Sequence, residues 1–263
     1  MVVRRNIFVC TVHIGHEPFW SKVQPNFLRT HLPHATLVAS VDKEIGETAS
    51  FDYKEALEGT HRDKLDELAK RVVDRMATSE DDLIIFLDGD AFPIRSLMPL
   101  ITNVLQDSCL AAICREENEE DYPHPSFCVT TAGLWKQLGC TWQESPDPAE
   151  ISELGGGQLR DLLRQRGLEW RRLRRSNAFN PHPLMFGLYE GVIYHHGAGF
   201  RKPITAADRR ALRDCVPGAM YGSPESYESL CNLIADRNQT MSAIFKDLVQ
   251  YVPEFHRVLE RKC

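Results

Sequence analysis

Two carboxylates separated by one glycine, Asp88 and Asp90, are the residues of this chain best suited to chemistry. They follow an apolar run, residues 83–87, which predicts a strand buried on both faces. Gly89 is expected to let the backbone turn tightly enough for the two side chains to converge. Like charges so close are costly without a cation or proton between them, and such oxygen ligands suit Mg²⁺ or Mn²⁺. A solvated acidic turn is the alternative interpretation.

A second segment, residues 195–203, combines two histidines, two glycines and two cations behind a predicted strand. A neutral imidazole can be the third ligand of a divalent ion that two carboxylates already hold. Glycines allow backbone N–H groups to approach a diphosphate, and Arg201 and Lys202 would neutralise its charge. The alternatives are packed, hydrogen-bonded histidines and a solvated Arg-Lys pair.

Together these segments resemble the nucleotide-sugar-dependent glycosyltransferases of the A-type fold, and in particular the glycogenin-like retaining family. The resemblance rests on Asp-x-Asp after an apolar strand and a distant His-x-x-Gly-x-x-Lys-Pro: Asp88, Asp90, His196, Gly199, Lys202 and Pro203. It implies that Asp88, Asp90 and His196 hold Mn²⁺ or Mg²⁺. It also implies that Lys202 meets the diphosphate of the donor.

Further donor-binding residues follow from position in such a fold. The first strand and its loop usually hold the base and ribose, and a basic residue on the helix before Asp-x-Asp often reaches the phosphates. For that basic residue the choice is Lys64 or Arg62, and an ordinary surface position is the alternative for each. The expected donor-binding set is Thr11, Val12, His13, Lys64, Gly89, Gly199 and Lys202.

The acceptor side departs from the family pattern. A Gly-Asp-Gln sequence is expected there, whereas this chain has three glycines, 155–157, before Gln158. Gln158 therefore matches and the acidic residue does not, which leaves retention or inversion open. The candidate catalytic residues are Gln158, Asp147 and Glu153, with Glu150 and Asp161 as further carboxylates that could act as a general base. Trp135 is interpreted either as core or as a platform for a sugar ring.

Strands and helices alternate along the first half of the chain. This order predicts an α/β fold with a mainly parallel central sheet in one Rossmann-like, A-type glycosyltransferase domain, residues 1–204. Residues 205–263 are predicted to form a helical C-terminal extension packed on it. The predicted strands of the first half are 7–12, 35–42, 83–87 and 109–114, and its predicted helices are 19–31, 62–76 and 95–106. In the second half, a strand and turn are predicted over 127–135, a helix over 154–167, a short strand over 169–174, and a strand that opens into a loop over 191–203.

The composition of the 263 residues limits the classes of molecule that the protein is expected to bind. A net charge of −6 argues against nucleic-acid or acidic-membrane binding, and no apolar stretch is long enough to span a bilayer. Eight cysteines are scattered without a CxxC pair, which with the absence of a signal sequence predicts a cytoplasmic setting.

The predicted function is a metal-dependent glycosyltransferase that moves a sugar from a UDP- or GDP-sugar to an unknown acceptor hydroxyl. One alternative is a phosphohydrolase of the haloacid-dehalogenase type, in which Asp88 would be the nucleophile and Asp90 the general acid. Phe92, where that pattern has Thr or Val, and the late position of the motif argue against it. The other alternative is a non-catalytic module that binds nucleotide sugars.

Overall fold

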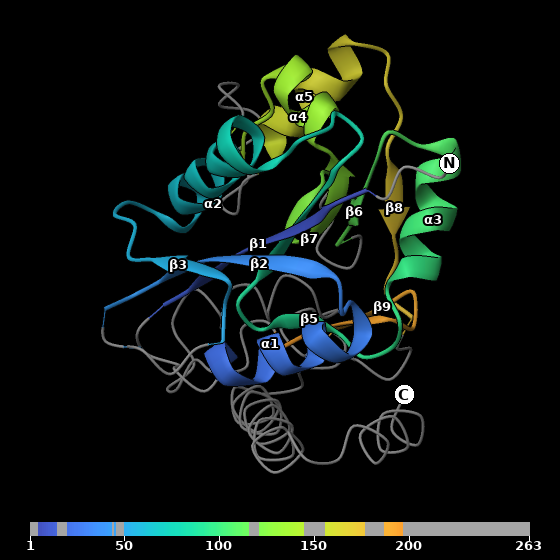
Figure 1. Ribbon diagram of the computed structural model, residues 1–263. Helices are drawn as coiled ribbons and strands as arrows, with labels where there is room; N and C mark the ends of the chain where they lie inside the picture. Colours follow the sequence, from blue (N-terminus) through green and yellow to red (C-terminus); the bar gives the residue numbers. More distant parts are fainter. Residues whose placement is uncertain are drawn as a thin grey trace, which may run out of the picture.

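A seven-stranded sheet, ordered β3-β2-β1-β4-β7-β6-β8, forms the centre of the molecule (Figure 1). This computed structural model describes residues 5–14, 20–43, 45, 50–115, 121–144, 156–176 and 187–196. Only β7 runs antiparallel to its neighbours, so the sheet is mainly parallel, as predicted. The strands are β1 (Ile7–His13), β2 (Ala35–Val41), β3 (Tyr53–Glu55), β4 (Leu83–Asp88), β6 (Leu110–Ile113), β7 (His124–Thr131) and β8 (Arg171–Leu173).

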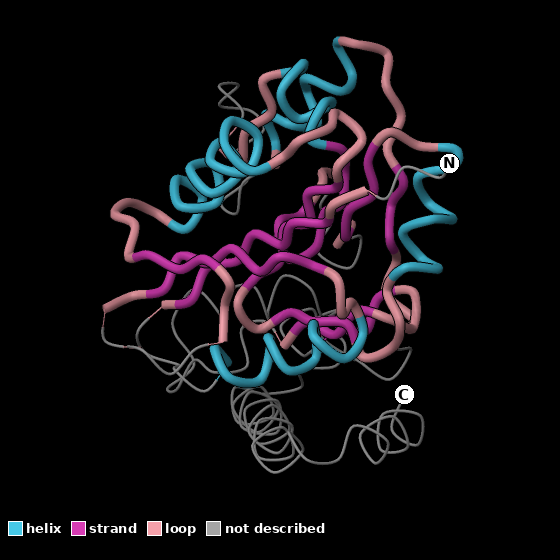
Figure 2. Tube along the Cα trace, viewed as in Figure 1, coloured by secondary structure: helices cyan, strands magenta, loops and turns pink. Residues whose placement is uncertain are grey.

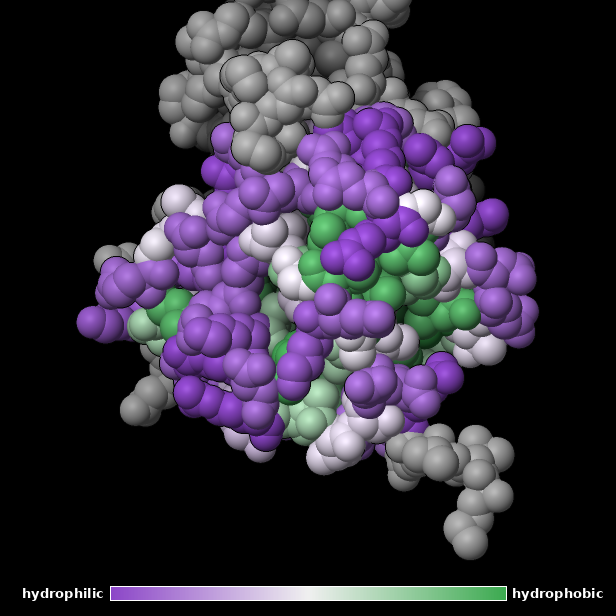
Figure 3. Space-filling view, turned by 90° about the horizontal axis from the view of Figure 1, so that it is seen from above, coloured by the Kyte–Doolittle hydropathy of each residue, from purple (hydrophilic) through white to green (hydrophobic). Residues whose placement is uncertain are grey.

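Helices cover both faces of this sheet, which gives three layers (Figure 2). One face packs against α1 (Trp20–His31) and α3 (Met98–Asp107). The other face packs against α2 (His61–Arg71), its π-helical continuation η2 (Val72–Met76), α4 (Ala132–Leu138) and α5 (Gly157–Gln165). Seen from the side of α2, α4 and α5, the surface is largely hydrophilic, and hydrophobic side chains show between the polar ones (Figure 3).

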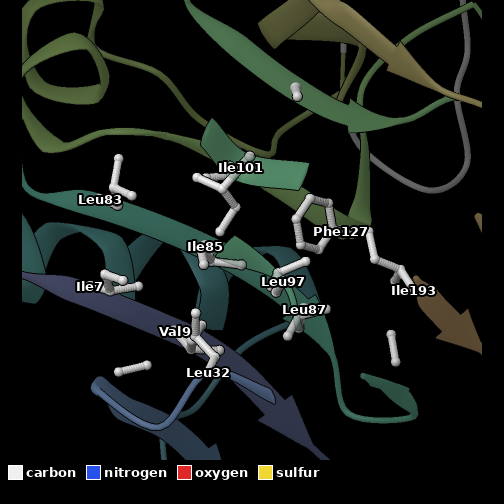
Figure 4. Packing of buried hydrophobic residues seen from close by; sticks show 14 of the residues in the cluster. Ile7, Val9, Leu32, Leu83, Ile85, Leu87, Leu97, Ile101, Phe127 and Ile193 are labelled. Carbon is white, nitrogen blue, oxygen red and sulfur yellow. The ribbon is translucent and has the colours of Figure 1, made fainter. Parts of the chain in front are cut away.

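Strand β4 is buried on both faces, as its apolar sequence predicts. Leu83, Ile85 and Leu87 point toward α1 and α3, where they meet side chains of β1 and α3 (Figure 4). Ile84 and Phe86 point to the opposite face and pack under α2 and α4. None of the five is more than 2% exposed, so the strand that carries the acidic pair is fixed from both sides.

A second, smaller sheet brings a late part of the chain to the acidic pair. It consists of β5 (Ala91–Pro93), β10 (Ile193–His195) and β9 (Gly187–Tyr189), all antiparallel. β5 begins directly after Asp90, and His195 pairs with Ala91. The backbone ladder therefore holds the histidine segment beside Asp-x-Asp, although the two are far apart in the sequence.

The sequence predicted the long elements and only some of the short ones, such as β8 and β10. The predicted strands of the first half and its three helices are present, with ends shifted by a few residues. Three short strands (β3, β5 and β9) were not expected, and the turn expected after residue 131 is helix α4. The predicted C-terminal extension, residues 205–263, lies outside the described residues. Within the described part, no helix has the length and apolar character needed to cross a membrane.

Truncating Ile85 tests the two-sided burial of β4. Ile85→Ala removes a side chain that is 0% exposed in the centre of the sheet, and should lower the free energy of unfolding by about 2–5 kcal/mol. Met98→Ala, at a position 37% exposed, should change it by about 0.5 kcal/mol or less. Urea denaturation of both variants measures the difference, and equal effects would contradict the described core.

Candidate metal centre

The carboxyl ends of β1 and β4 lie side by side where the strand order reverses. From β1 the chain crosses one face through α1 to β2, and it returns over the other face through α2 to β4. In open α/β sheets, ligands bind outside the carboxyl ends of the strands at such a reversal point. Val12 pairs with Asp88 there, so the end of the first strand lies beside the acidic pair.

Asp88, Asp90 and His195 form a group that could hold a metal ion. His195 Nε2 lies 3.5 Å from Asp88 Oδ2 and 3.5 Å from Asp90 Oδ1. One ligand atom from each of the three residues lies within 4.8 Å of the others. The carboxylates are partly buried and the imidazole is buried, so the group lies at the edge of the interior.

The chemistry of this group fits a divalent cation. Ligands at about 2.1 Å from an octahedral ion lie about 3 Å from one another, so only small side-chain shifts are needed. Among the described residues, Asp88 Oδ1 is a buried side-chain oxygen without a hydrogen-bond partner, although His61 Nε2 lies 3.3 Å from it. A buried carboxylate with too few hydrogen bonds is costly, and a cation bound to the same carboxylate through Oδ2, the oxygen that faces His195, would reduce that cost.

Burial keeps His195 in the form that can bind a metal. Desolvation lowers the pKa of His195 to about 4; Asp88 opposes this shift, and Arg115 and Arg175 add to it. The ring is therefore neutral at pH 7, and the neutral imidazole is the form that binds metals.

His196 lies on the other side of β10, which corrects the ligand assigned from the sequence motif. Its Nδ1 is 2.8 Å from the Tyr194 hydroxyl, and its ring centre is 5.1 Å from that of Trp20. Side chains alternate across a strand, so His195 and His196 cannot both face the carboxylates. His196 contributes through its backbone instead, because its N–H donates to the carbonyl of Asp90 at 3.1 Å.

Gln24 ties the end of β1 to the acidic turn. Its side-chain oxygen accepts from Thr11 Oγ1 at 3.0 Å and lies 2.9 Å from His13 Nε2. Its amide nitrogen donates to the carbonyls of Asp88 and Ala91, both at 2.7 Å. The side chains of Thr11 and His13 are therefore engaged inside the protein, and contact of Thr11, His13 or Val12 with a base and ribose stays a prediction.

Gly89 is required for close packing against β1. A Cβ at this position would lie 2.6 Å from the carbonyl oxygen of Val12 and 2.9 Å from His13 Nδ1. Gly89 is not among the residues with positive φ. The turn expected from the sequence is present at residues 89–90, and the close approach of two backbone segments is a second reason for glycine at this position.

The two basic residues expected on α2 have acidic partners. Lys64 Nζ lies 2.8 Å from Asp42 Oδ1, just beyond the end of β2, and its side chain is mostly buried. Arg62 pairs with Glu144. A contact of Lys64 with phosphate stays a prediction, and it would require Lys64 to share its charge with Asp42.

The acceptor side is described only in part. Gln158 is half-buried in the first turn of α5. The preceding Gly156 has φ 93°, and a Cβ there would lie 2.0 Å from the carbonyl oxygen of Pro123, next to His124. Asp161 forms an ion pair with Arg160 at 2.9 Å. The expected residues Asp147, Glu150, Glu153, Gly199, Arg201 and Lys202 lie outside the described part of the chain.

Trp135 belongs to the core and not to a sugar-binding surface. Its ring centre lies 4.5 Å from that of Phe86 and 5.6 Å from that of Trp142, and the residue is buried. The core interpretation of Trp135 is therefore confirmed.

Sequence reasoning missed three residues around the group. His61, the first residue of α2, has its Nε2 3.3 Å from Asp88 Oδ1. The ring of His124 lies 6.2 Å from that of His195, and Arg115 Nη1 lies 3.1 Å from His124 Nε2. None of the three belongs to a motif with the acidic pair, although Thr60 and Asp63 do indicate a helix that begins at His61.

Comparison with known proteins gives distant structural similarity alone. No protein-family model and no curated protein matches the sequence. The fold is similar to that of the glycosyltransferase GlyE of Streptococcus pneumoniae, with 11% identity over 65% of this chain and 45% of GlyE, and a TM-score of 0.44. The chain thus spans less than half the length of that structure.

Two other solved structures show similarity of the same kind. One is the galactosyltransferase LgtC in complex with donor and acceptor sugar analogues, with 11% identity over 62% of this chain and 66% of LgtC, and a TM-score of 0.33. The other is a glycosyltransferase involved in the glycosylation of the major capsid of PBCV-1, with 9% identity over 64% of this chain and 80% of that structure, and a TM-score of 0.37.

A side chain at position 89 should damage the centre more than the fold. Gly89→Ala forces Val12 and the acidic turn apart, so the Mn²⁺ affinity measured by calorimetry should fall by about tenfold or more. Losses of this size are typical when a residue that orients a metal ligand is changed. Gly139→Ala is the control, because it adds only backbone strain of about 1 kcal/mol at an open position with φ 63°. Unchanged Mn²⁺ affinity in Gly89→Ala would contradict the close approach.

The buried imidazoles should make the protein acid-sensitive above the range of its carboxylates. Burial lowers the pKa of His13 and His195 to about 4 and that of His196 to about 3. Between pH 6.5 and 4 the unfolded chain binds protons that the native chain excludes, so stability is lost as pH falls through that range. His196→Phe should make the decline shallower by about 1–2 kcal/mol between pH 7.5 and 5 in urea denaturation. An unchanged slope would contradict a neutral, buried His196.

Proposed function

We propose that this protein is a metal-dependent glycosyltransferase of the A-type fold, which transfers a sugar from a UDP- or GDP-sugar to an acceptor hydroxyl. The observation that carries the proposal is the meeting of Asp88, Asp90 and His195 at the carboxyl ends of β1 and β4. A carboxylate–carboxylate–imidazole group at a reversal point of the strand order is a suitable place for a cation and a nucleotide diphosphate.

The acidic pair and His195 would hold Mn²⁺ or Mg²⁺ beside the diphosphate of the donor. A bound cation supplies Lewis-acid stabilisation of the charge that develops on the leaving nucleoside diphosphate. Hydrogen bonds fix the acidic turn before any ligand binds. The side-chain amide of Gln24 donates to the carbonyls of Asp88 and Ala91, and the backbone N–H of His196 donates to the carbonyl of Asp90. Such pre-ordering reduces the reorganisation that the reaction requires.

Cations of the chain support the binding of a polyanionic donor even though the net charge is −6. Arg115 and Arg175 lie close enough to His195 to lower its pKa. We assign them to the electrostatic field that attracts the diphosphate, together with Lys202 and Arg201 of the sequence motif. Lys64, which pairs with Asp42 at the end of β2, is a further candidate on the α2 side.

For the acceptor side of the proposed reaction we name candidate residues, without choosing between retention and inversion. Gln158 remains the candidate on the acceptor side, and Asp147 and Glu153 remain candidates for a carboxylate that acts on the acceptor hydroxyl. In an inverting reaction that carboxylate would take the proton of the hydroxyl as it attacks the anomeric carbon.

Metal-dependent stabilisation by nucleotide sugars tests the proposal. UDP- and GDP-sugars should raise the Tm of the wild-type protein with Mn²⁺ or Mg²⁺ present and not with EDTA, and slow donor hydrolysis should follow the same dependence. Asp90→Asn and His195→Ala should remove the effect, because each deletes a metal ligand. His34→Ala, an exposed histidine, is the matched control. A wild-type protein without any metal-dependent shift would refute the proposal.

The same variants separate the alternatives. A phosphohydrolase would release phosphate from simple phosphomonoesters, and Asp88→Asn would abolish that release because Asp88 would be the nucleophile. A binding module would show the nucleotide-dependent shift with neither transfer nor donor hydrolysis. Either result would displace the transferase.

A further inference from the structure

His61 stands at a fixed point on the rim of the metal centre. It is the first residue of α2, directly after the N-cap Thr60. Thr60 and Asp63 form a reciprocal capping box, in which the N–H of Thr60 donates to Asp63 Oδ2 at 2.9 Å and the N–H of Asp63 donates to Thr60 Oγ1 at 3.3 Å. The backbone that carries His61 is therefore held in place before any ligand binds.

The imidazole of His61 faces the oxygen of Asp88 that His195 does not use. His61 Nε2 lies 3.3 Å from Asp88 Oδ1, whereas His195 Nε2 lies 3.5 Å from Asp88 Oδ2. Oδ1 is buried and has no hydrogen-bond partner within the described ranges of the chain. A small rotation of the carboxylate or the ring would complete a hydrogen bond between Nε2–H of His61 and Oδ1.

His61 lies outside the group of atoms that could share one ion. That group comprises Asp88, Asp90 and His195 among the described residues, and the contact of His61 is to the far side of the first carboxylate. The position of His61 suits a residue that hydrogen-bonds to the metal ligand Asp88 better than it suits a metal ligand itself. Carboxylates that bind metals are themselves hydrogen-bonded, because this fixes the torsion that otherwise rotates freely.

We infer that His61 is a positioning residue, which donates a hydrogen bond to Asp88 Oδ1 and so orients Asp88 Oδ2 toward a metal ion shared with Asp90 and His195. This inference rests on the proposed function for the existence of the ion. It makes α2 part of the metal centre, because His61 is the first residue of that helix. The same helix is also tied to Asp42, beyond the end of β2, through Lys64.

Mn²⁺ alone, titrated into the full chain, tests the inference. His61→Leu removes the donor and keeps bulk, and should weaken Mn²⁺ binding by about 10–100-fold in calorimetry, as for other support residues of metal ligands. His61→Gln keeps an N–H donor at similar reach and should recover most of that loss. His34→Ala is the matched control, because that histidine is exposed. Thermal unfolding without metal should be similar for all variants, which shows that the fold is retained.

The nitrogen couplings of bound Mn²⁺, measured by pulsed electron paramagnetic resonance, distinguish support from ligation. One imidazole nitrogen should couple in the wild type and in His61→Gln alike. Two coupled imidazoles in the wild type would overturn the positioning role, as would wild-type affinity in His61→Leu. If the wild type binds Mn²⁺, Asp90→Asn abolishes that binding, and His61→Leu keeps the wild-type affinity, only this inference fails. If the wild type binds no Mn²⁺, the proposed function fails with it.

Discussion

The antiparallel pairing of β10 with β5 is the interaction on which the candidate centre depends. The ladder places His195 opposite Ala91, one residue beyond Asp90, and the backbone bond from His196 to Asp90 continues it. Without this ladder the two carboxylates would still leave the sheet together beside His61, but His195 would have no fixed position near them. Backbone hydrogen bonds are suited to this task because they fix register to a single residue.

The surroundings of the acidic pair show how the fold tolerates close negative charge. The carboxylates lie at the edge of the sheet, and burial lowers the pKa of the neighbouring His195 and of His124 beside it, so these two rings supply polarity without full positive charge. The carbonyls of Asp88 and Ala91 are occupied by Gln24. In the described part of the chain, the buried oxygen of this pair without a hydrogen-bond partner is Asp88 Oδ1, which faces His61, so a hydrogen bond donated there would have a large effect.

Much of the fold could be predicted from the sequence because its long elements have strong periodic patterns. The apolar run before Asp88 specifies a buried strand, and the spacing of Leu65, Leu68 and Val72 specifies a helix face. Short strands such as β5 and β9 carry too few residues for a pattern, and they exist because they pair with β10. Tertiary pairing of this kind is not encoded locally.

The structure brings the predicted acidic pair together with a histidine, but with His195 and not with His196. An acidic pair and a distant histidine were expected to meet, but which of two adjacent histidines turns inward depends on the phase of a three-residue strand. His61 could not be predicted at all, because its relation to Asp88 arises from where a helix begins in space. Gly89 was expected for its turn, which is present, whereas its close approach to β1 could not be predicted from the sequence.

The long separation between β5 and β10 along the chain has a kinetic consequence. Contacts between distant segments form late, because closing a long loop costs entropy before any bond repays it. β1, β2 and β4 are complete well before β10 has been synthesised, whereas the third candidate ligand arrives near the end of the described chain. A nascent chain would therefore present two repelling carboxylates for some time, and the ability to capture a cation at full strength would be gained only when β10 pairs with β5.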